Sequence, residues 1–261
     1  MQRRIAQTLA AHVGRADYLT TSELAELAGV SQPSVVRFAT ALGFSGYADL
    51  RRALRDLEPG DQGQQSTPAQ NTYQLAVAEE IANLSRLHAS LADSSSLERI
   101  GAIFAASQPL VIVGVRASQA LARYCAFYAR KVHPRVLLIE EVGSSALDQL
   151  YEARRAGAAA VLAVAMPRWP RELLPLLEAA RTLDYCVVGL TDQSGSPVLD
   201  YTDHSLLVPV GTTLLYDTHA AALVTLSLLV EAIADADPTA AEVLMEAFES
   251  RAHAHQYFLK S

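Results

Sequence analysis

The sequence has little cysteine, little positive charge and no long apolar run. Its two cysteines, Cys125 and Cys186, lie far apart within apolar stretches. This spacing argues against a disulfide or a cysteine metal site, and it favours a cytoplasmic protein with reduced thiols. The longest apolar stretch, 220–230, contains Thr225 and Ser227 and falls short of the roughly 20 residues that span a bilayer. We therefore expect no membrane segment, and we also expect no bound metal and no cofactor.

Positive charge is scarce and unevenly distributed. The net charge of −7 excludes a protein that coats nucleic acid over its whole surface. Residues 1–57 nevertheless hold seven arginines against five acidic residues, so this segment carries +2 and the remainder carries −9. A basic head on an acidic body favours DNA contact through one small domain.

Residues 21–38 have the spacing of a helix-turn-helix motif. Gly29 falls where the first helix must end in a left-handed turn, and Val35, six residues later, is predicted to pack the second helix against the first. Ser31 is predicted to cap the second helix through its hydroxyl group. Pro33 falls in the first turn, where a missing N–H costs little.

The second helix of the motif is predicted to have two faces. Val35, Ala39 and Leu42 recur at spacings of three and four residues and are expected to face inward. The outward polar side chains expected to contact DNA are Ser31, Gln32, Ser34 and Arg37. An arginine held in a bidentate pair with guanine contributes ~1–3 kcal/mol of discrimination. The alternative is the solvated face of an ordinary helical bundle.

A further helix is predicted over 46–57, with Arg51, Arg52 and Arg55 on one side. These arginines, Arg51 in particular, are expected to contact DNA phosphates, although a purely solubilising face fits equally well. Residues 59–70 contain two prolines and two glycines without apolar periodicity, which indicates a linker that spans roughly 20 Å as a coil. The expected domains are thus a helix-turn-helix domain over 1–58, this linker, and a second domain over 71–261.

The second domain is predicted to be α/β, with a doubly wound five-stranded parallel sheet. It opens with an amphipathic helix near residue 72, whose stripe includes Tyr73, Val77 and Ile81, and with a second helix over 95–106. Short apolar runs without alternation then follow at 110–113, 136–139, 159–165, 186–190 and 206–210. Helical stretches between the first four runs favour strands buried on both faces. An apolar helix is expected over 214–234, in a core or a subunit interface.

Ligands of such sheets bind beyond the carboxyl ends of the strands, where the strand order reverses. Polar or cationic residues follow three of the predicted strands, and the expected ligand-binding residues are Gly114, Arg116, Ser118, Arg168, Trp169, Arg171, Thr191 and Asp192. Paired arginines suit a phosphate or carboxylate, and an indole face suits a sugar ring. At each of these places an ordinary turn or a packed side chain is the alternative.

Nearly the whole chain resembles the RpiR family of bacterial transcription regulators. In the first domain the resemblance rests on residues 31–38 and 42–51, and in the second on 111–114 with Ser118, on 189–192, and on Ser196-Pro197 ahead of Asp203. It implies an amino-terminal helix-turn-helix joined to a sugar isomerase (SIS) domain that senses phosphosugars. One departure stands out. The loop 166–171 has neither the hydroxyl groups nor the glycine of the usual phosphate-binding loop, so either Arg168 and Arg171 replace it or the ligand is not a phosphosugar.

These observations lead us to expect a transcription regulator rather than an enzyme. Its partners would be a double-stranded DNA operator and a small anionic, sugar-derived effector. The second domain is expected to form a homodimer or tetramer that places two heads on half-sites about 34 Å, or a multiple, apart. The main alternative is a sugar-phosphate isomerase, which needs a general base; Glu140 and Glu141 are the candidates. A dimeric scaffold that senses nothing is a third possibility.

Overall fold

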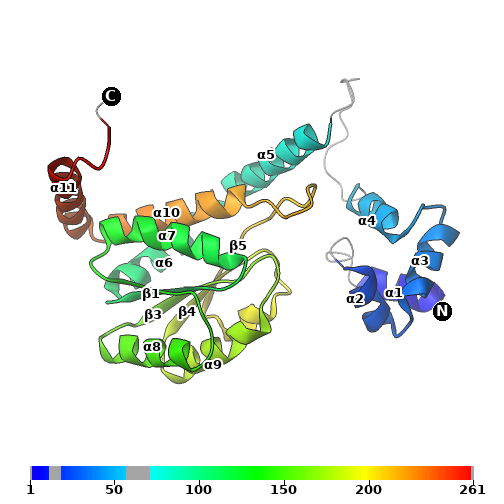
Figure 1. Ribbon diagram of the computed structural model, residues 1–261, viewed down its shortest axis with the longest axis horizontal. Helices are drawn as coiled ribbons and strands as arrows, with labels where there is room; N and C mark the ends of the chain where they lie inside the picture. The colour runs from blue at the N-terminus through cyan, green and yellow to red at the C-terminus, as the bar shows by residue number, and fades with distance from the viewer. Residues whose placement is uncertain (1, 12–18, 57–70, 260–261) are drawn as a thin grey trace. The chain divides into compact units, whose positions relative to one another are not determined.

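A computed structural model describes residues 2–11, 19–56 and 71–259, and it divides the chain into two compact units, Met1–Pro68 and Ala69–Ser261 (Figure 1). Each unit has its own hydrophobic core. The predicted linker over 59–70 lies outside the described residues. The two units are therefore described separately.

The first unit is built from four short helices around a small core. They are α1 (Gln2–Ala11), α2 (Thr21–Ala28), α3 (Gln32–Ala41) and α4 (Tyr47–Asp56). Its buried side chains include Ile5, Leu24, Val35, Phe38 and Leu50. The Tyr47 hydroxyl donates a 3.0 Å hydrogen bond to the carbonyl of Leu19, which ties the start of α4 to the segment before α2. These contacts hold the helix-turn-helix in place.

The second unit alternates helices and strands. Its elements are α5 (Thr72–Ser90), α6 (Ser95–Ala106), β1 (Leu110–Gly114), α7 (Ser118–Val132), β2 (Val136–Ile139), α8 (Ser144–Arg155), β3 (Ala160–Val164), η2 (Arg171–Leu173), α9 (Leu174–Thr182), β4 (Cys186–Thr191), η3 (Pro197–Tyr201), β5 (His204–Leu207), α10 (Ala220–Ala236) and α11 (Pro238–Ala254). Among the described residues, no helix combines the length and the hydropathy needed to cross a bilayer.

All five strands form one parallel sheet in the order β2-β1-β3-β4-β5. Helices α6, α7 and α10 cover one face, and α8 and α9 cover the other (Figure 1). The predicted fold class is confirmed. Because the chain moves from β1 outward to β2 and then returns to β3 on the other side of β1, the strand order reverses between β1 and β3.

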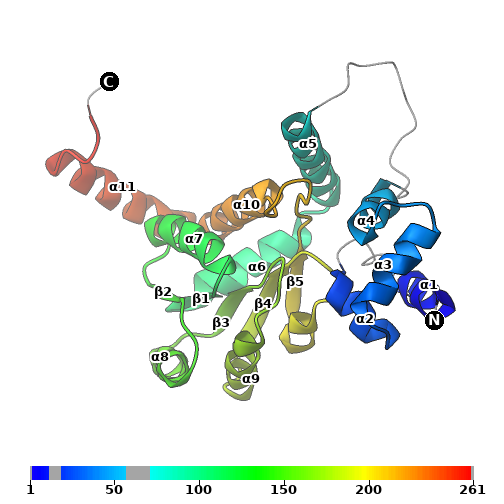
Figure 2. The ribbon, with the colours of Figure 1, turned by 45° about the vertical axis from the view of Figure 1, so that its right-hand side comes forward.

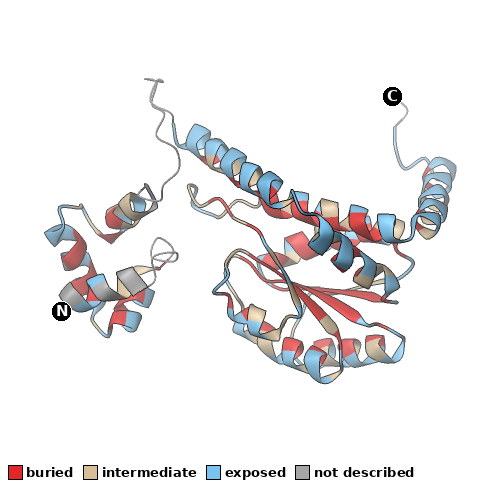
Figure 3. Cartoon of the chain, turned by 180° about the vertical axis from the view of Figure 1, so that it is seen from behind, coloured by how far each residue is buried: buried red, intermediate tan, exposed pale blue. Residues whose placement is uncertain are grey.

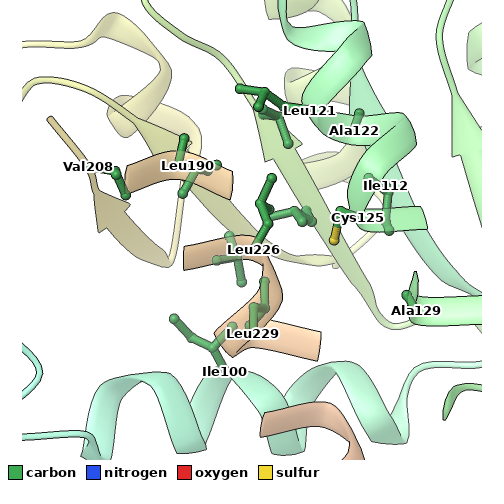
Figure 4. Packing of buried hydrophobic residues seen from close by; sticks show 14 of the residues in the cluster. Ile100, Ile112, Leu121, Ala122, Cys125, Ala129, Leu190, Val208, Leu226 and Leu229 are labelled. Atoms are coloured by element: carbon green, nitrogen blue, oxygen red, sulfur yellow. The ribbon is translucent and has the colours of Figure 1, made fainter. Parts of the chain in front are cut away.

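The larger core lies between the sheet and the layer of α6, α7 and α10 (Figure 4). Leu226 and Leu229 of α10 lie between Ile100 of α6 and the sheet. Helices α6 and α10 cross closely at Gly101, where an added Cβ would lie 2.5 Å from the carbonyl oxygen of Ala232. Glycine at this position therefore allows the close crossing that brings α10 onto the sheet.

Two predicted boundaries near the end of the sheet are wrong. The last strand covers His204–Leu207 rather than 206–210, and the apolar helix begins at Ala220 rather than at residue 214. Between them, Gly211 and Thr218 pair their backbones and close a loop in which Leu215 and Tyr216 are exposed. The apolar residues in this stretch lie in a surface loop, and their pattern therefore predicted a helix wrongly.

The predicted stripe of α5 also differs from the buried face. Tyr73, Val77 and Ile81 are exposed, whereas Asn83 and Leu87 are buried (Figure 3). A helix buries the face that meets its neighbours, whatever its apolar pattern, and α5 packs mainly on α10. Among the described residues of the second unit, nothing therefore covers this apolar face of α5.

Candidate functional site

The turn between α2 and α3 has the geometry expected of a helix-turn-helix. Gly29 ends α2 in a left-handed conformation with φ of 60°, as the sequence predicts, and Pro33 lies in the first turn of α3. Thr20 and Glu23 cap the start of α2 reciprocally, each side chain bonding the other residue's backbone N–H. The short connection between the helices is thus fixed by local backbone and side-chain bonds.

The exposed face of α3 carries three of the predicted DNA-binding residues: Ser31, Gln32 and Arg37. Gln32 Nε2 donates to the hydroxyl of Ser22 at 3.1 Å, and Arg37 Nη2 donates to Ser34 Oγ at 3.3 Å. This hydrogen bond, which Ser34 Oγ accepts, directs the Arg37 guanidinium along the helix surface. Among these residues Arg37 carries the only formal charge, and its exposure leaves it available to a base edge or a phosphate.

The prediction that Ser34 faces outward is wrong. Ser34 lies four residues before Phe38 and beside Val35, so it falls within the buried face of α3. Its hydroxyl bonds the Ser31 hydroxyl at 2.9 Å, and Ser31 therefore makes no side-chain cap to the backbone, contrary to expectation. Ser34 is thus buried, and its hydroxyl accepts the hydrogen bond that positions the Arg37 side chain.

Leu42, predicted to face inward, is exposed because α3 ends at Ala41 and leaves Leu42 in a turn.

On α4, Arg51 is half-buried and Arg52 is exposed, while the side chain of Arg55 lies outside the described residues. Asp49 accepts hydrogen bonds from the backbone N–H and the hydroxyl of Ser45, which lower the pKa of its carboxyl group. This bond fixes the approach to α4.

In the second unit, the loops after β1 and β3 are tied together at the switch in strand order. The hydroxyl of Ser118 donates to the carbonyl of Met166 and accepts from its N–H, both at 3.1 Å. The N–H groups of Ser118 and Gln119 bond the carbonyls of the preceding turn. Ser118 and the start of α7, predicted to hold an anion, are therefore engaged in holding the two loops together.

Gly114 and Arg116 also have structural partners. A Cβ on Gly114 would lie 2.5 Å from the side chain of Ala122, so this glycine permits the close approach of α7 to β1. Arg116 has a left-handed backbone with φ of 54°, and its guanidinium pairs with the carboxylate of Glu172 at 2.5 Å. Glu172 thus neutralises one of the cations predicted to bind an anionic ligand.

Three predicted ligand residues from the loops after β3 and β4 do come together. Trp169 Nε1 donates to Thr191 Oγ1 at 3.2 Å, and the Thr191 hydroxyl lies 3.4 Å from Asp192 Oδ1. The hydrogen bond turns the indole edge toward β4, and Trp169 is half-buried. Arg168 and Arg171, in the same loop as Trp169, are exposed.

Two buried oxygens in this cluster have no hydrogen-bond partner among the described residues. They are Oδ2 of Asp192 and Oε1 of Gln193, a residue that our sequence prediction did not include. Burial raises the pKa of Asp192 above its ordinary value, although hydrogen bonds within the loop act in the opposite direction. Buried acceptors of this kind fit the hydroxyl groups of a polyol, and the nearby arginines fit an anionic group.

The candidate general bases of an isomerase are placed less favourably. Glu140 accepts hydrogen bonds from the guanidinium of Arg123 with both carboxylate oxygens. Glu141 is exposed. A general base needs a free lone pair directed at the substrate. In the structure both carboxylate oxygens of Glu140 are instead engaged by Arg123.

A known family of helix-turn-helix domains matches the sequence of the first unit. Residues 1–57 match the family model described as "Helix-turn-helix domain, rpiR family". The amino-terminal unit is an rpiR-family helix-turn-helix domain. The resemblance seen in the sequence is thereby confirmed for this part of the chain.

Solved structures show the same fold for the remainder. The NanR protein of Vibrio vulnificus, complexed with ManNAc-6P, is 21% identical, with a TM-score of 0.64 over 97% of this chain and 92% of that one. The sugar isomerase domain of an RpiR transcription factor from Sphaerobacter thermophilus is also 21% identical. It has a TM-score of 0.60 over 68% of this chain and 99% of that one. The second domain therefore has the sugar isomerase domain fold.

Replacing Asp192 with asparagine tests the burial of this carboxyl group. A carboxyl whose pKa is raised in the folded state destabilises the fold as pH rises above the ordinary aspartate range. Asp192→Asn should therefore raise the melting temperature at pH 7 by roughly 1–3 °C and leave it unchanged at pH 3, where both side chains are neutral. Differential scanning calorimetry at both pH values measures this, and a lower melting temperature at pH 7 would contradict it.

Proposed function

We propose that this chain is a DNA-binding transcription regulator whose second domain senses a small anionic, sugar-derived metabolite, a sugar phosphate or a sugar acid. In this proposal the first domain, residues 1–58, reads the operator. Residues 59–70 link it to the second domain, residues 71–261, which binds the effector and dimerises. The single observation that supports the first part is the exposed Arg37 on the second helix of an rpiR-family helix-turn-helix domain. Such a regulator acts on DNA in the cytoplasm.

The cluster after β3 and β4 supports the sensing role. Asp192 and Gln193 offer buried acceptors for sugar hydroxyl groups, and Trp169 offers a flat apolar surface beside them. Arg168 and Arg171 supply the positive charge for a phosphate or carboxylate. They stand in the loop where the usual hydroxyl-rich phosphate cradle is missing, so charge replaces hydroxyl groups in our proposal.

A binding role fits this cluster better than turnover. Isomerisation requires a base placed beside a sugar carbon, and the glutamate candidates are either paired with Arg123 or exposed. The proposed protein binds and releases its effector unchanged. Detectable conversion of a sugar phosphate by the purified chain would overturn this part of the proposal.

Dimerisation is proposed on the uncovered apolar face of α5. Tyr73, Val77 and Ile81 are exposed along one side of this helix, a pattern typical of a surface that another protein covers. A second copy related by a two-fold axis would set two heads on half-sites about 34 Å, or a multiple, apart. Sedimentation of the purified chain distinguishes a dimer from a tetramer.

The DNA-binding part is tested with operators selected from a random duplex library by the full-length chain. Arg37→Ala should weaken binding by ~1–3 kcal/mol and relax the preference at one base in each half-site, because a bidentate contact to guanine is lost. Fluorescence anisotropy on the selected operator measures the affinity. Arg155→Ala, an exposed arginine of α8, is the matched control and should leave the affinity unchanged.

Arg52→Ala serves as a second comparison on the exposed side of α4. Loss of a phosphate contact should weaken binding to all DNA sequences alike. It should also reduce the slope of log affinity against log salt concentration by about one. Equal operator affinity and equal base preference for Arg37→Ala and the unaltered chain would remove Arg37 as a reader.

The sensing part is tested by thermal shift with glucose 6-phosphate, ribose 5-phosphate, N-acetylmannosamine 6-phosphate and gluconate, each compared with its neutral sugar. A compound that binds should raise the melting temperature by about 5 °C at a hundredfold excess over Kd. Replacing Arg168 and Arg171 together with alanine should abolish the advantage of the anionic compounds. If no anionic compound exceeds its neutral counterpart, the dimeric scaffold becomes the better description.

A further inference from the structure

Two neighbouring glutamates on α5 fasten this helix to the loop that follows β5. Glu79 Oε2 accepts hydrogen bonds from the N–H groups of Thr212 and Thr213, both at 2.9 Å. Glu79 Oε1 accepts from the Thr212 hydroxyl at 3.1 Å, and Glu80 accepts from the Thr218 hydroxyl. The partners are 133 to 138 residues apart in the sequence. We call this set of contacts between Glu79, Glu80 and residues 211–218 the latch.

The loop is shaped to receive both carboxylates. Gly211 and Thr218 exchange backbone hydrogen bonds of 3.1 and 2.8 Å, which close the loop at its base. A Cβ on Gly211 would lie 2.6 Å from Glu80 Oε1, so glycine is needed for the carboxylate to approach. Burial disfavours the charged form of Glu79, but the hydrogen bonds from Thr212 and Thr213 outweigh it, and the pKa of Glu79 lies below its ordinary value.

Little else attaches the first half of α5 to the domain. Between residues 72 and 81 only Ala76 is buried, and Tyr73, Leu75 and Val77 are exposed (Figure 3). A helical segment with few buried apolar contacts opens at low free energy. Among the described residues of the second unit, the latch is therefore the principal restraint on this half of the helix.

The latch lies between the start of α5 and the proposed ligand-binding edge. Helix α5 begins at Thr72, directly after the stretch that leads from the DNA-binding domain. The loop follows β5 at the ligand-binding edge, where the N–H of Val208 bonds the carbonyl of Thr191, the residue before Asp192. Figure 2 shows the loop that precedes α10 beside α5. A displacement at the end of β4 can thus reach α5 through the loop.

Polar atoms around the latch are incompletely paired. Asn83 is fully buried and its Nδ2 has no partner among the described residues; the same holds for Glu80 Oε2 and His219 Nδ1. An unpaired buried polar group costs about 1–3 kcal/mol. A second arrangement of α5 and the loop that pairs these atoms would compete with the present one, as a two-state element requires.

We propose that the latch transmits the state of the ligand-binding edge to the DNA-binding domain, with Glu79 as its positioning residue; this inference rests on the proposed function. Effector binding at Asp192 and Gln193 moves the loop, the loop moves α5, and α5 sets the point from which the chain leads back to the DNA-binding domain. The two sites then influence each other only as strongly as the latch couples them.

The first test is hydrogen–deuterium exchange on the full-length chain. Glu79→Gln removes the charged double acceptor and should speed exchange in both α5 and residues 211–218 by about tenfold. Thr212→Val removes one hydroxyl donor but keeps the backbone bonds, so it should produce a smaller change in the same two segments. Glu231→Gln, an exposed carboxylate on α10, is the matched control.

The second test is operator affinity, measured where sedimentation shows both proteins in the same oligomeric state; a merely structural role of Glu79 would not change it under that condition. Glu79→Gln should change the affinity for the selected operator at least about fivefold, although it lies outside the helix-turn-helix domain. Unchanged affinity in Glu79→Gln, with normal binding by the unaltered chain, would overturn the latch alone. Failure of the unaltered chain to select any DNA would instead overturn the proposed function, and the exchange data would still show whether the latch holds α5.

Discussion

Burial of the central sheet on both faces is the constraint on which the rest of the second domain depends. Strands β1 and β3 are buried throughout, so each needs a helical layer above and below it. Parallel strands joined by helices then present all their carboxyl ends at one edge. The reversal between β1 and β3 places their following loops side by side, and Ser118 ties these loops through the backbone of Met166. The edge where we propose ligand binding is a consequence of this topology.

The central strands β1, β3 and β4 were predictable because a strand buried on both faces appears as an unbroken apolar run, and the predicted runs agree with them within one residue at each end. The run at 136–139 also coincides with β2, although β2 is a mostly half-buried edge strand. The edge strand β5 alternates between half-buried and exposed positions, so the nearby apolar run misplaced it. The start of α10 was misplaced because Leu214, Leu215 and Tyr216 extend the apolar pattern into a surface loop.

The polar residues that follow each strand could be identified from the sequence, but their partners could not. Arg116 and Ser118 lie where an anion site was expected, yet Glu172 and the backbone of Met166 engage them from 56 and 48 residues away. Local spacing contains no information about such distant contacts. The same holds for Ser34, whose polar side chain gave no sign that it lies on the buried face of α3. It also holds for Glu79, whose partner Thr212 follows it by 133 residues, after all five strands.

We propose a reading helix, a ligand-binding edge and a helix that connects them. Central to this proposal, Arg37 reads a guanine in the major groove. Methylation of guanine N7 removes the acceptor that such an arginine needs. In a methylation-interference experiment on the selected operator, we predict one blocked guanine in each half-site, and loss of this interference with Arg37→Ala. An identical interference pattern for both proteins, or none at all, would contradict the claim.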